Sequence, residues 1–384
     1  MICRSIASFC LATLSWSPAY GAEPELDRLK AHVTELSAPR FAGRRDVGAK
    51  LARDYLTAEF QKLQLAPLFE GSYAQDITGA EPSDLLGVNV GARLDPTGPE
   101  FANQWIILGA HYDHLGTING VIYPGADDNA SGVSMMLEVA RAVVGSPPTS
   151  RRGIMFVGFD LEERGPHGEF GLRGSQFFAA HPPRPLDRVH LFVTADMIGR
   201  SLGGVCREDL FVLGSEREPE VRPWIRSAAP GASLRVNLLG ADVLMIDRSD
   251  YGPFRARQVP YLFFTTGENP LYHSPGDVAA TLDFPKLTAI SQVIARVVRS
   301  ASEATNPPRW AAEPDYPVTE ARDFRHIFQT LLDHQADLKI SPNQRRMMVR
   351  AMATADAVIA RGTMTPEERN TIVRTAQLVL FTLF

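Results

Sequence analysis

The chain has 384 residues, of which 45% are hydrophobic and 22% charged, with 39 basic against 44 acidic side chains. This composition is typical of a globular protein and excludes collagen-like, intrinsically disordered and multi-span membrane chains. The net charge of −5 lacks the basic excess of nucleic-acid-binding proteins, so nucleic acid is not an expected partner. Three cysteines, Cys3, Cys10 and Cys206, are too few for a disulfide scaffold.

Residues 1–21 have the pattern of a signal peptide. Arg4 supplies a positive start, residues 6–14 are apolar, and the segment Pro-Ala-Tyr-Gly at residues 18–21 offers small side chains for cleavage after Gly21. The apolar stretch is too short to span a membrane. We therefore expect an exported protein, periplasmic or secreted, which retains Cys206 as its one cysteine.

Helical and strand patterns alternate through the next part of the chain. Residues 25–65 are predicted to be helical, with a break rich in glycine and arginine at residues 41–45, and a further helix is expected over residues 132–144. The expected strands are residues 86–92, 105–110, 154–159, 189–195, 210–213 and 259–265. Several of these runs are almost continuously apolar, which is typical of strands buried on both faces. The pattern predicts an α/β three-layer sandwich with a mostly parallel mixed central sheet, within a domain of residues 22–305.

The C-terminal part of the sequence has a different pattern, with a proline-rich segment followed by helical segments. Residues 306–317 contain four prolines, which predicts a linker. Three helical segments follow within residues 318–384. Two of them begin with a capping box and a proline at the first helical position, at Ser341-Pro342 and Thr365-Pro366. We expect a small helical subdomain, and its sequence shows no group of catalytic side chains.

Imidazole and carboxylate side chains follow the expected strands where each strand ends. They are His111, Glu162 and Glu163, Asp196 and His273, and Asp128 lies just before the helix at residues 132–144. Ligands bind at the carboxyl ends of the strands in open α/β sheets. Carboxylates gathered at such an edge are costly unless they are compensated, and a divalent cation would compensate them.

The types of side chain indicate the metal. Imidazoles and carboxylates without a thiolate suit zinc or a similar ion. One catalytic zinc ion uses three protein ligands, so five candidate ligands fit two metal ions if one carboxylate bridges them.

The motifs resemble those of the zinc aminopeptidase family, which includes secreted bacterial and vacuolar aminopeptidases, glutamate carboxypeptidases and glutaminyl cyclases. Their order and spacing agree, and the resemblance covers roughly residues 30–300. The motifs are His111-Tyr112-Asp113, Asp128-Asn129-Ala130-Ser131-Gly132, Glu162-Glu163, Asp196-Met197-Ile198-Gly199 and Tyr272-His273-Ser274-Pro275-Gly276-Asp277.

The resemblance implies two zinc ions per chain. His111, Asp128 and Asp196 would hold one ion. Asp128, Glu163 and His273 would hold the other, so that Asp128 bridges the two.

The resemblance also implies the roles of three further side chains. Glu162 would be the general base that takes a proton from the bridging water and passes it to the leaving amine. Tyr272 would donate a hydrogen bond to the oxyanion. Asp113 would accept a hydrogen bond from His111 and so select its tautomer.

One segment departs from the family pattern. Residues 164–170 separate the Glu-Glu pair from the Gly-Leu-Arg-Gly-Ser segment that usually follows it closely. This insert is expected to border the site and to alter the substrate pocket. His114 and His167 are close to the motifs in sequence, but we expect neither to bind metal because both positions are already filled.

The leading functional interpretation is an exported two-zinc aminopeptidase whose partner is a peptide with a free N-terminus. Two alternatives keep the same scaffold: a glutaminyl cyclase-like acyltransferase, and a carboxypeptidase that would use Arg164 or Arg200 to bind a carboxylate. A non-catalytic binding protein is the minor alternative, because such relatives lose metal ligands and this chain has lost none. The oligomeric state stays open.

Overall fold

The computed structural model describes residues 22–81, 83–145, 150–165, 171–229 and 234–383. The predicted signal peptide and residues 166–170 of the insert lie outside the described residues. The main sheet is formed by β1 Ala66–Pro67, β2 Ala74–Thr78, β3 Leu85–Leu94, β4 Trp105–His111, β7 Gly153–Phe159, β8 Val189–Ala195, β9 Asp209–Leu213, β10 Arg235–Leu239 and β11 Tyr261–Thr265. A separate hairpin consists of β5 Gly116–Ile118 and β6 Val121–Tyr123.

The strand order of the sheet is β1-β3-β7-β4-β8-β11-β9-β10, and β2 pairs with β3. The centre is parallel, since β4 pairs in parallel with both β7 and β8, and β8 with β11. β9 also pairs in parallel with β10, whereas four junctions are antiparallel: β1, β2 and β7 each with β3, and β11 with β9. The predicted mixed central sheet is therefore confirmed, with its parallel strands at the centre. The sequence prediction missed the short strands β1, β2, β5, β6 and β10. The run Arg-Val-Asn-Leu-Leu of β10, for example, is too polar at its start to stand out.

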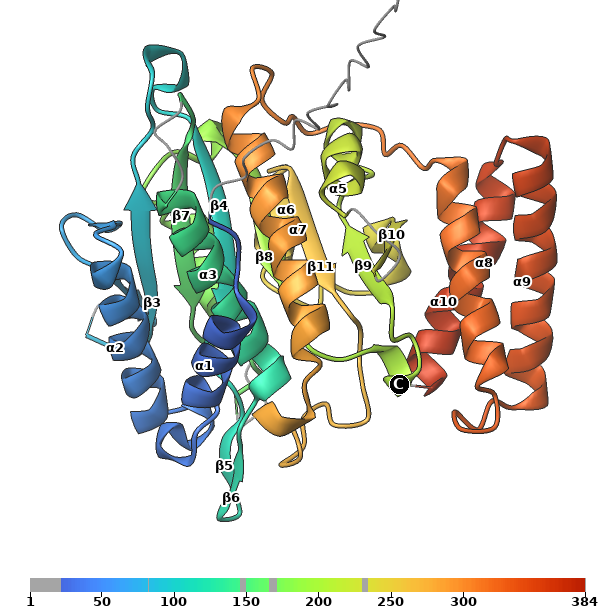
Figure 1. Ribbon diagram of the computed structural model, residues 1–384, viewed down its shortest axis with the longest axis horizontal. Helices are drawn as coiled ribbons and strands as arrows, with labels where there is room; N and C mark the ends of the chain where they lie inside the picture. Colours follow the sequence, from blue (N-terminus) through green and yellow to red (C-terminus); the bar gives the residue numbers. More distant parts are fainter. Residues whose placement is uncertain (1–21, 82, 146–149, 166–170, 230–233, 384) are drawn as a thin grey trace, which may run out of the picture.

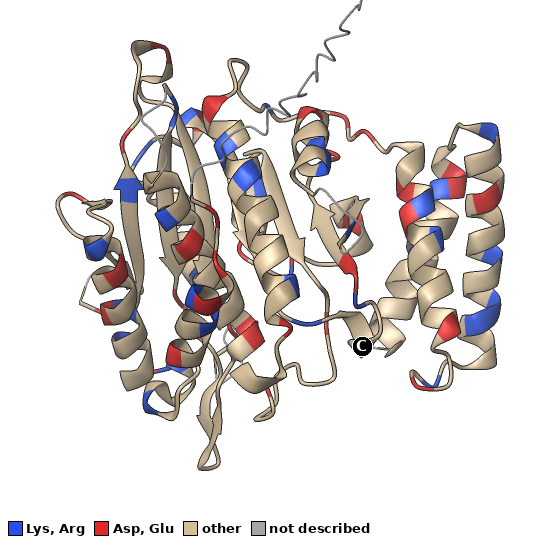
Figure 2. Cartoon of the chain, in the orientation of Figure 1, with Lys and Arg blue, Asp and Glu red and all other residues tan. Residues whose placement is uncertain are grey.

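Helices cover both faces of the sheet (Figure 1). They are α1 Leu26–Leu36, α2 Val47–Lys62, α3 Gly132–Val144, α4 Arg173–Ala180, α5 Arg222–Ala228, α6 Tyr251–Arg255 and α7 Phe284–Glu303. Successive strand residues alternate between two cores, since Ile106 and Leu108 of β4 face the core under α1, α3 and α7, whereas Trp105 and Ile107 face α4 and α6. The strands are almost free of charged residues along their lengths (Figure 2), as burial on both faces requires.

Three helices follow at the C-terminal end, as predicted: α8 Val318–Asp333, α9 Pro342–Arg361 and α10 Pro366–Leu383. They stand beside β9 and β10 at one edge of the sheet (Figure 1). Ser341 forms the expected capping box with Gln344 at the start of α9. Phe324 and Phe328 of α8 belong to the same buried core as Phe211 of β9, so these helices share a core with the sheet. No helix of the described residues combines the length and apolarity needed to cross a membrane.

Candidate metal centre

The five predicted ligands come together at the carboxyl ends of the central strands. His111 is the last residue of β4, Asp196 directly follows β8, and Glu163 lies in the turn after β7. His273 lies in the loop after β11, and Asp128 lies in the irregular turn η3 Ala126–Ser131 that leads into α3. The sheet edge predicted from the sequence is therefore where these side chains meet.

Asp128 lies between two groups of side chains. Its Oδ1 is 3.4 Å from Nε2 of His111, and its Oδ2 is 3.2 Å from Nε2 of His273. Nε2 of His111 is also 3.4 Å from Oδ1 of Asp196, and Nε2 of His273 is 3.2 Å from Oε2 of Glu163. The two oxygens of one carboxylate thus face two different imidazoles, each accompanied by a second carboxylate.

These residues fit two metal ions. Two ligand atoms that are each ~2.1 Å from a tetrahedral zinc ion stand about 3.4 Å apart, close to the separations found here. Three buried ligand atoms have no hydrogen-bond partner within the described residues: Nε2 of His111, Nε2 of His273 and Oδ1 of Asp196. Buried polar atoms without partners are costly, and bound cations would compensate all three.

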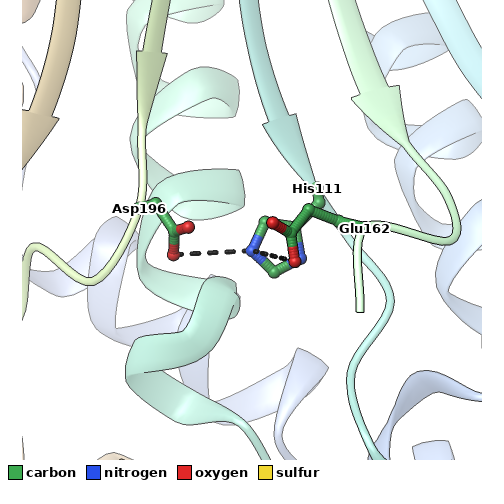
Figure 3. A group of neighbouring side chains, drawn as sticks. All are labelled: His111, Glu162 and Asp196. Carbon is green, nitrogen blue, oxygen red and sulfur yellow. Dashed lines mark ion pairs between the residues drawn. The ribbon is translucent and has the colours of Figure 1, made fainter. Parts of the chain in front are cut away.

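Glu162 lies beside the first group, in the turn that also carries Glu163. Figure 3 shows that Glu162 and Asp196 both approach Nε2 of His111, and Oε2 of Glu162 is 3.9 Å from that atom. Burial raises the pKa of Glu162 well above its usual range, His111 opposes this rise, and the neighbouring Glu163 and Asp196 reinforce it. Its position beside the predicted metal site, with a pKa raised by its surroundings, suits a group that accepts and returns a proton.

The acidic side chains around His111 also shift its pKa. Burial alone would lower the pKa of His111, but Glu162 and Asp196 outweigh it and raise the pKa well above its usual range. The cluster therefore attracts positive charge strongly, which a divalent cation would supply in place of protons.

Asp113 has contacts beyond the predicted one with His111. Its Oδ1 is 3.6 Å from Nδ1 of His111, and its backbone oxygen is 3.3 Å from the same atom. Its carboxylate also accepts hydrogen bonds from the backbone N–H groups of Glu162 at 3.0 Å and Glu163 at 3.2 Å. Asp113 thus holds in place the turn that presents both glutamates.

His114 lies closer to the site than the sequence suggested. Its Nδ1 is 2.8 Å from Oε1 of Glu163 and 3.8 Å from Oδ2 of Asp128, and its ring packs edge-on against His273. His114 is buried and within reach of the second metal position together with Asp128 and Glu163. Its position directly after the His-Tyr-Asp motif is the sequence signal that could have found it. His167 lies outside the described residues.

Tyr272 stacks on His273, with ring centroids 3.8 Å apart. Burial raises the pKa of its hydroxyl above the usual range, and the nearby Asp128 and Glu163 add to that rise. The hydroxyl therefore keeps its proton at neutral pH and is available as a hydrogen-bond donor.

Asp277 ends the Tyr-His-Ser-Pro-Gly-Asp motif and supports the turn that carries Asp128. Its carboxylate accepts hydrogen bonds from the backbone N–H groups of Asp127 at 2.9 Å and Asp128 at 3.2 Å, and from Nη1 of Arg200 at 2.7 Å. Arg200, which the carboxypeptidase alternative would use, is thus buried and paired. Arg164, the other candidate, is exposed.

Arg44 supports the same turn from the other side, and sequence reasoning noted it only as part of a helix break. Its guanidinium is fully buried and donates to five backbone carbonyl oxygens, those of Leu36, Tyr112, Pro124, Gly125 and Asp128, at 2.6 to 3.1 Å. One side chain thus ties the end of α1 to the segments that carry His111 and Asp128.

Replacing Arg44 with methionine is expected to lower the free energy of unfolding by about 3 kcal/mol or more, because buried carbonyl groups lose their donor. Chemical denaturation measures this loss. The exposed Arg207 provides the matched control, and Arg207→Met is expected to unfold like the wild type. Equal stability of Arg44→Met and the wild type would contradict a supporting role for Arg44.

The acidic cluster opens into a cavity of about 710 Å³. Asp128, Glu162, Glu163 and Asp196 lie at one end of it, together with Tyr272 and His273. The rest of its lining is mainly apolar. A cavity of this size with a few polar groups at one end is typical of a substrate site.

The model of peptidase family M28 matches residues 89–298, which is more than half of the chain and contains every predicted ligand. The chain belongs to peptidase family M28. The resemblance seen in the sequence is thereby confirmed, and with it the expectation of a hydrolase that acts on peptides.

Three proteins that are similar to this chain in sequence differ in how much of their own length the chain covers. The uncharacterized protein YfbL of Escherichia coli is 25% identical over 306 residues, which cover 71% of this chain and 87% of YfbL. The aminopeptidase YwaD of Bacillus subtilis is 25% identical over 211 residues, which cover 53% of this chain and 42% of YwaD. A probable zinc metalloprotease of Pyrenophora teres f. teres is 27% identical over 53% of this chain and 46% of its own length. The chain thus spans less than half of these last two proteins.

Solved structures show the same fold. The glutaminyl cyclase of Porphyromonas gingivalis superimposes with a TM-score of 0.59 at 20% identity, over 73% of this chain and 99% of the cyclase. The LapA aminopeptidase of Legionella pneumophila superimposes with a TM-score of 0.55 at 19% identity, over 73% of each chain. At these identities the likeness concerns the fold, and the predicted α/β architecture is confirmed.

Proposed function

We propose that this M28 peptidase is an exported zinc aminopeptidase that binds two metal ions and removes the N-terminal residue of peptides. The observation that carries the proposal is the position of Asp128, whose two carboxylate oxygens face His111 and His273 separately. A carboxylate in this position suits a ligand shared by two metal ions. The names of the relatives, a probable zinc metalloprotease and an aminopeptidase, support zinc and the exopeptidase class. Export rests on the sequence pattern of residues 1–21.

In this proposal His111, Asp128 and Asp196 would hold one zinc ion, and Asp128, Glu163 and His273 would hold the other. Zinc bound there would polarise the scissile carbonyl and lower the pKa of water.

Protein side chains then transfer the proton and stabilise the oxyanion during hydrolysis. Glu162 takes a proton from the attacking water, whose oxygen bonds to the carbonyl carbon. The C–N bond breaks, and Glu162 returns the proton to the leaving nitrogen, so that the products are a free amino acid and a shortened peptide. Tyr272 donates a hydrogen bond to the oxyanion formed between these steps.

Two features weigh against the alternative reactions. A carboxypeptidase needs a cation for the substrate carboxylate, but Arg200 is paired with Asp277, and Arg248 at the cavity is paired with Glu268. Arg164 is exposed and is not among the described residues that line the cavity. A glutaminyl cyclase must accept the glutamine side chain, whose amide would lose its water among the apolar side chains that line most of this cavity.

A substrate panel tests the proposal. We expect hydrolysis of aminoacyl p-nitroanilides that have a free amine, no hydrolysis of their N-acetylated forms, and no cyclisation of peptides that begin with glutamine. Exhaustive chelation should abolish the activity, and added zinc should restore it. Activity that survives chelation would overturn the metal assignment, and cleavage of N-acetylated substrates or formation of pyroglutamate would overturn the aminopeptidase assignment.

A further inference from the structure

The C-terminal helices form one wall of the cavity that contains the acidic cluster. Leu213 of β9 and Leu239 of β10 line the cavity on the side of the sheet. Phe328 and Leu331 of α8 and Val379 and Leu380 of α10 line it on the opposite side. The helices that lack catalytic side chains therefore enclose the space next to the predicted metal ions.

Ion pairs attach this wall to the rest of the protein. Arg369 of α10 contacts both carboxylate oxygens of Asp242 at 2.7 Å, and it contacts Glu320 of α8 at 2.7 and 2.9 Å. Glu320 also accepts a hydrogen bond at 2.8 Å from the backbone of Gly240, just after β10. Arg369 thus connects α8 and α10 to the segment that follows β10, the edge strand of the sheet.

The polar side chains that line the cavity beyond the metal centre already have partners. Arg248 pairs with Glu268, the side-chain amide of Gln377 donates to the backbone oxygen of Asp242 at 2.7 Å, and Thr265 accepts from the backbone of Gly267 at 3.1 Å. A ligand in this part of the cavity therefore finds mainly apolar contacts. Its recognition depends on apolar area rather than on hydrogen bonds.

The cavity is larger than one ordinary amino-acid side chain requires. One water molecule occupies about 30 Å³ in the liquid. A volume of about 710 Å³ therefore has room for roughly 20 groups of that size. Three further lining residues extend the apolar surface to the outside, since Met245, Ile246 and Phe381 are 61%, 59% and 72% exposed. The space is therefore suited to an extended chain rather than to a single compact side chain.

We propose that this cavity binds an extended aliphatic chain, of about ten carbons or more, carried on the acyl side of the scissile amide. The inference rests on the proposed function. An aminopeptidase holds the N-terminal residue of its substrate next to the metal ions, and the rest of the peptide extends out of the site. The aliphatic chain then lies between the sheet and the helices α8 and α10. Two sources share this chemistry: a lipidic N-terminal amino acid with a free amine, and a fatty acyl group without one.

Hydrolysis as a function of chain length tests the proposal. The substrates are p-nitroanilides of alanine, leucine and 2-aminododecanoic acid, together with dodecanoyl p-nitroanilide. Each methylene that enters the cavity is expected to raise kcat/KM by about threefold to fourfold, so the aminododecanoyl substrate should exceed the leucine substrate by at least about 100-fold. Preference for the dodecanoyl substrate would assign the cavity to fatty acyl groups instead. Equal kcat/KM for the leucine and aminododecanoyl substrates, with dodecanoyl p-nitroanilide hydrolysed no faster than either, would overturn the inference.

A cavity-filling variant localises the effect. Ala376 of α10 lines the cavity, and Ala376→Trp is expected to lower the ratio of kcat/KM for the long substrate over the leucine substrate by at least about tenfold. The matched control is Ala357→Trp at an exposed position of α9, which should keep the wild-type ratio. Should Ala376→Trp fail to fold, Leu380→Trp at a half-buried lining position is the second variant. A wild-type ratio in a folded cavity-filling variant would contradict this location.

Binding of a fluorescent fatty acid to the metal-free protein separates this inference from the proposed function. We expect one cis-parinaric acid molecule per chain, displaced by 2-aminododecanoic acid and bound more weakly by Ala376→Trp. If no amide is hydrolysed but the probe binds in this way, the proposed function fails and the cavity assignment stands. If leucine p-nitroanilide is hydrolysed and the probe does not bind, the cavity assignment fails. Binding that weakens as protein concentration rises would assign the cavity to a second copy of the chain.

Discussion

Replacement of Glu162 by glutamine should lower kcat for an aminoacyl p-nitroanilide by about 10²- to 10⁴-fold, because glutamine neither accepts nor returns the proton of the attacking water. The bound metal should stay, since in the proposed ligand sets Glu162 lies beside His111 and Asp196 without being a ligand. Steady-state kinetics and metal analysis on the same preparation measure both quantities.

The control for Glu162→Gln is Glu220→Gln, which makes the same change at an exposed residue outside the predicted site. It should keep the wild-type rate and metal content. A near-wild-type rate in Glu162→Gln would remove Glu162 as the general base. Loss of metal in that variant would instead identify Glu162 as a metal ligand. The test covers this outcome because the carboxylate of Glu162 lies close to His111 and Asp196.

Replacement of Asp128 by asparagine should reduce the zinc content from about two ions per chain to one or fewer, because Asp128 is the ligand that both proposed positions share. Hydrogen-bond partners of metal ligands typically contribute 10- to 100-fold to affinity or activity, so loss of a direct ligand should lower kcat/KM by at least about 100-fold. Metal content after dialysis, measured together with kcat/KM, checks both expectations.

Asp54→Asn is the control for Asp128→Asn, since Asp54 is exposed on α2 and pairs only with Lys50 four residues earlier among the ion pairs of the described chain. It should bind metal and turn over substrate like the wild type. Two tightly bound zinc ions in Asp128→Asn would contradict the shared ligand, and a loss of one ion with full activity would contradict the two-metal mechanism.

Local signals predicted the long apolar strands of the sheet well. The expected strand at residues 189–195 coincides with β8 Val189–Ala195, and the expected helix at residues 132–144 coincides with α3. Both are marked by features that depend on nearby residues, an apolar run that ends at Asp196 and a helical pattern that follows Gly132. The short strands at the sheet edge lack such runs, and β10 was missed for this reason.

The support of the metal centre was less predictable. Arg44 contacts the backbone of Asp128, 84 residues later in the sequence, and Asp277 contacts the backbone of Asp127, 150 residues earlier. Every residue has a backbone carbonyl group, and every residue except proline has a backbone N–H, so such contacts leave no pattern of side-chain types in the sequence. His114 was set aside on a count of ligands, whereas the structure places its ring beside Glu163.

The sequence by itself determined the family, the α/β architecture and the strand ends that carry His111, Asp128, Glu163, Asp196 and His273. It could do so because these features depend on local apolar runs and short motifs. Only the tertiary structure decided that Asp128 faces two imidazoles and that α8 and α10 close the substrate cavity. That cavity is built from residues between Asp128 and Phe381, which come together only when the C-terminal helices pack on the edge of the sheet and bury a shared apolar core.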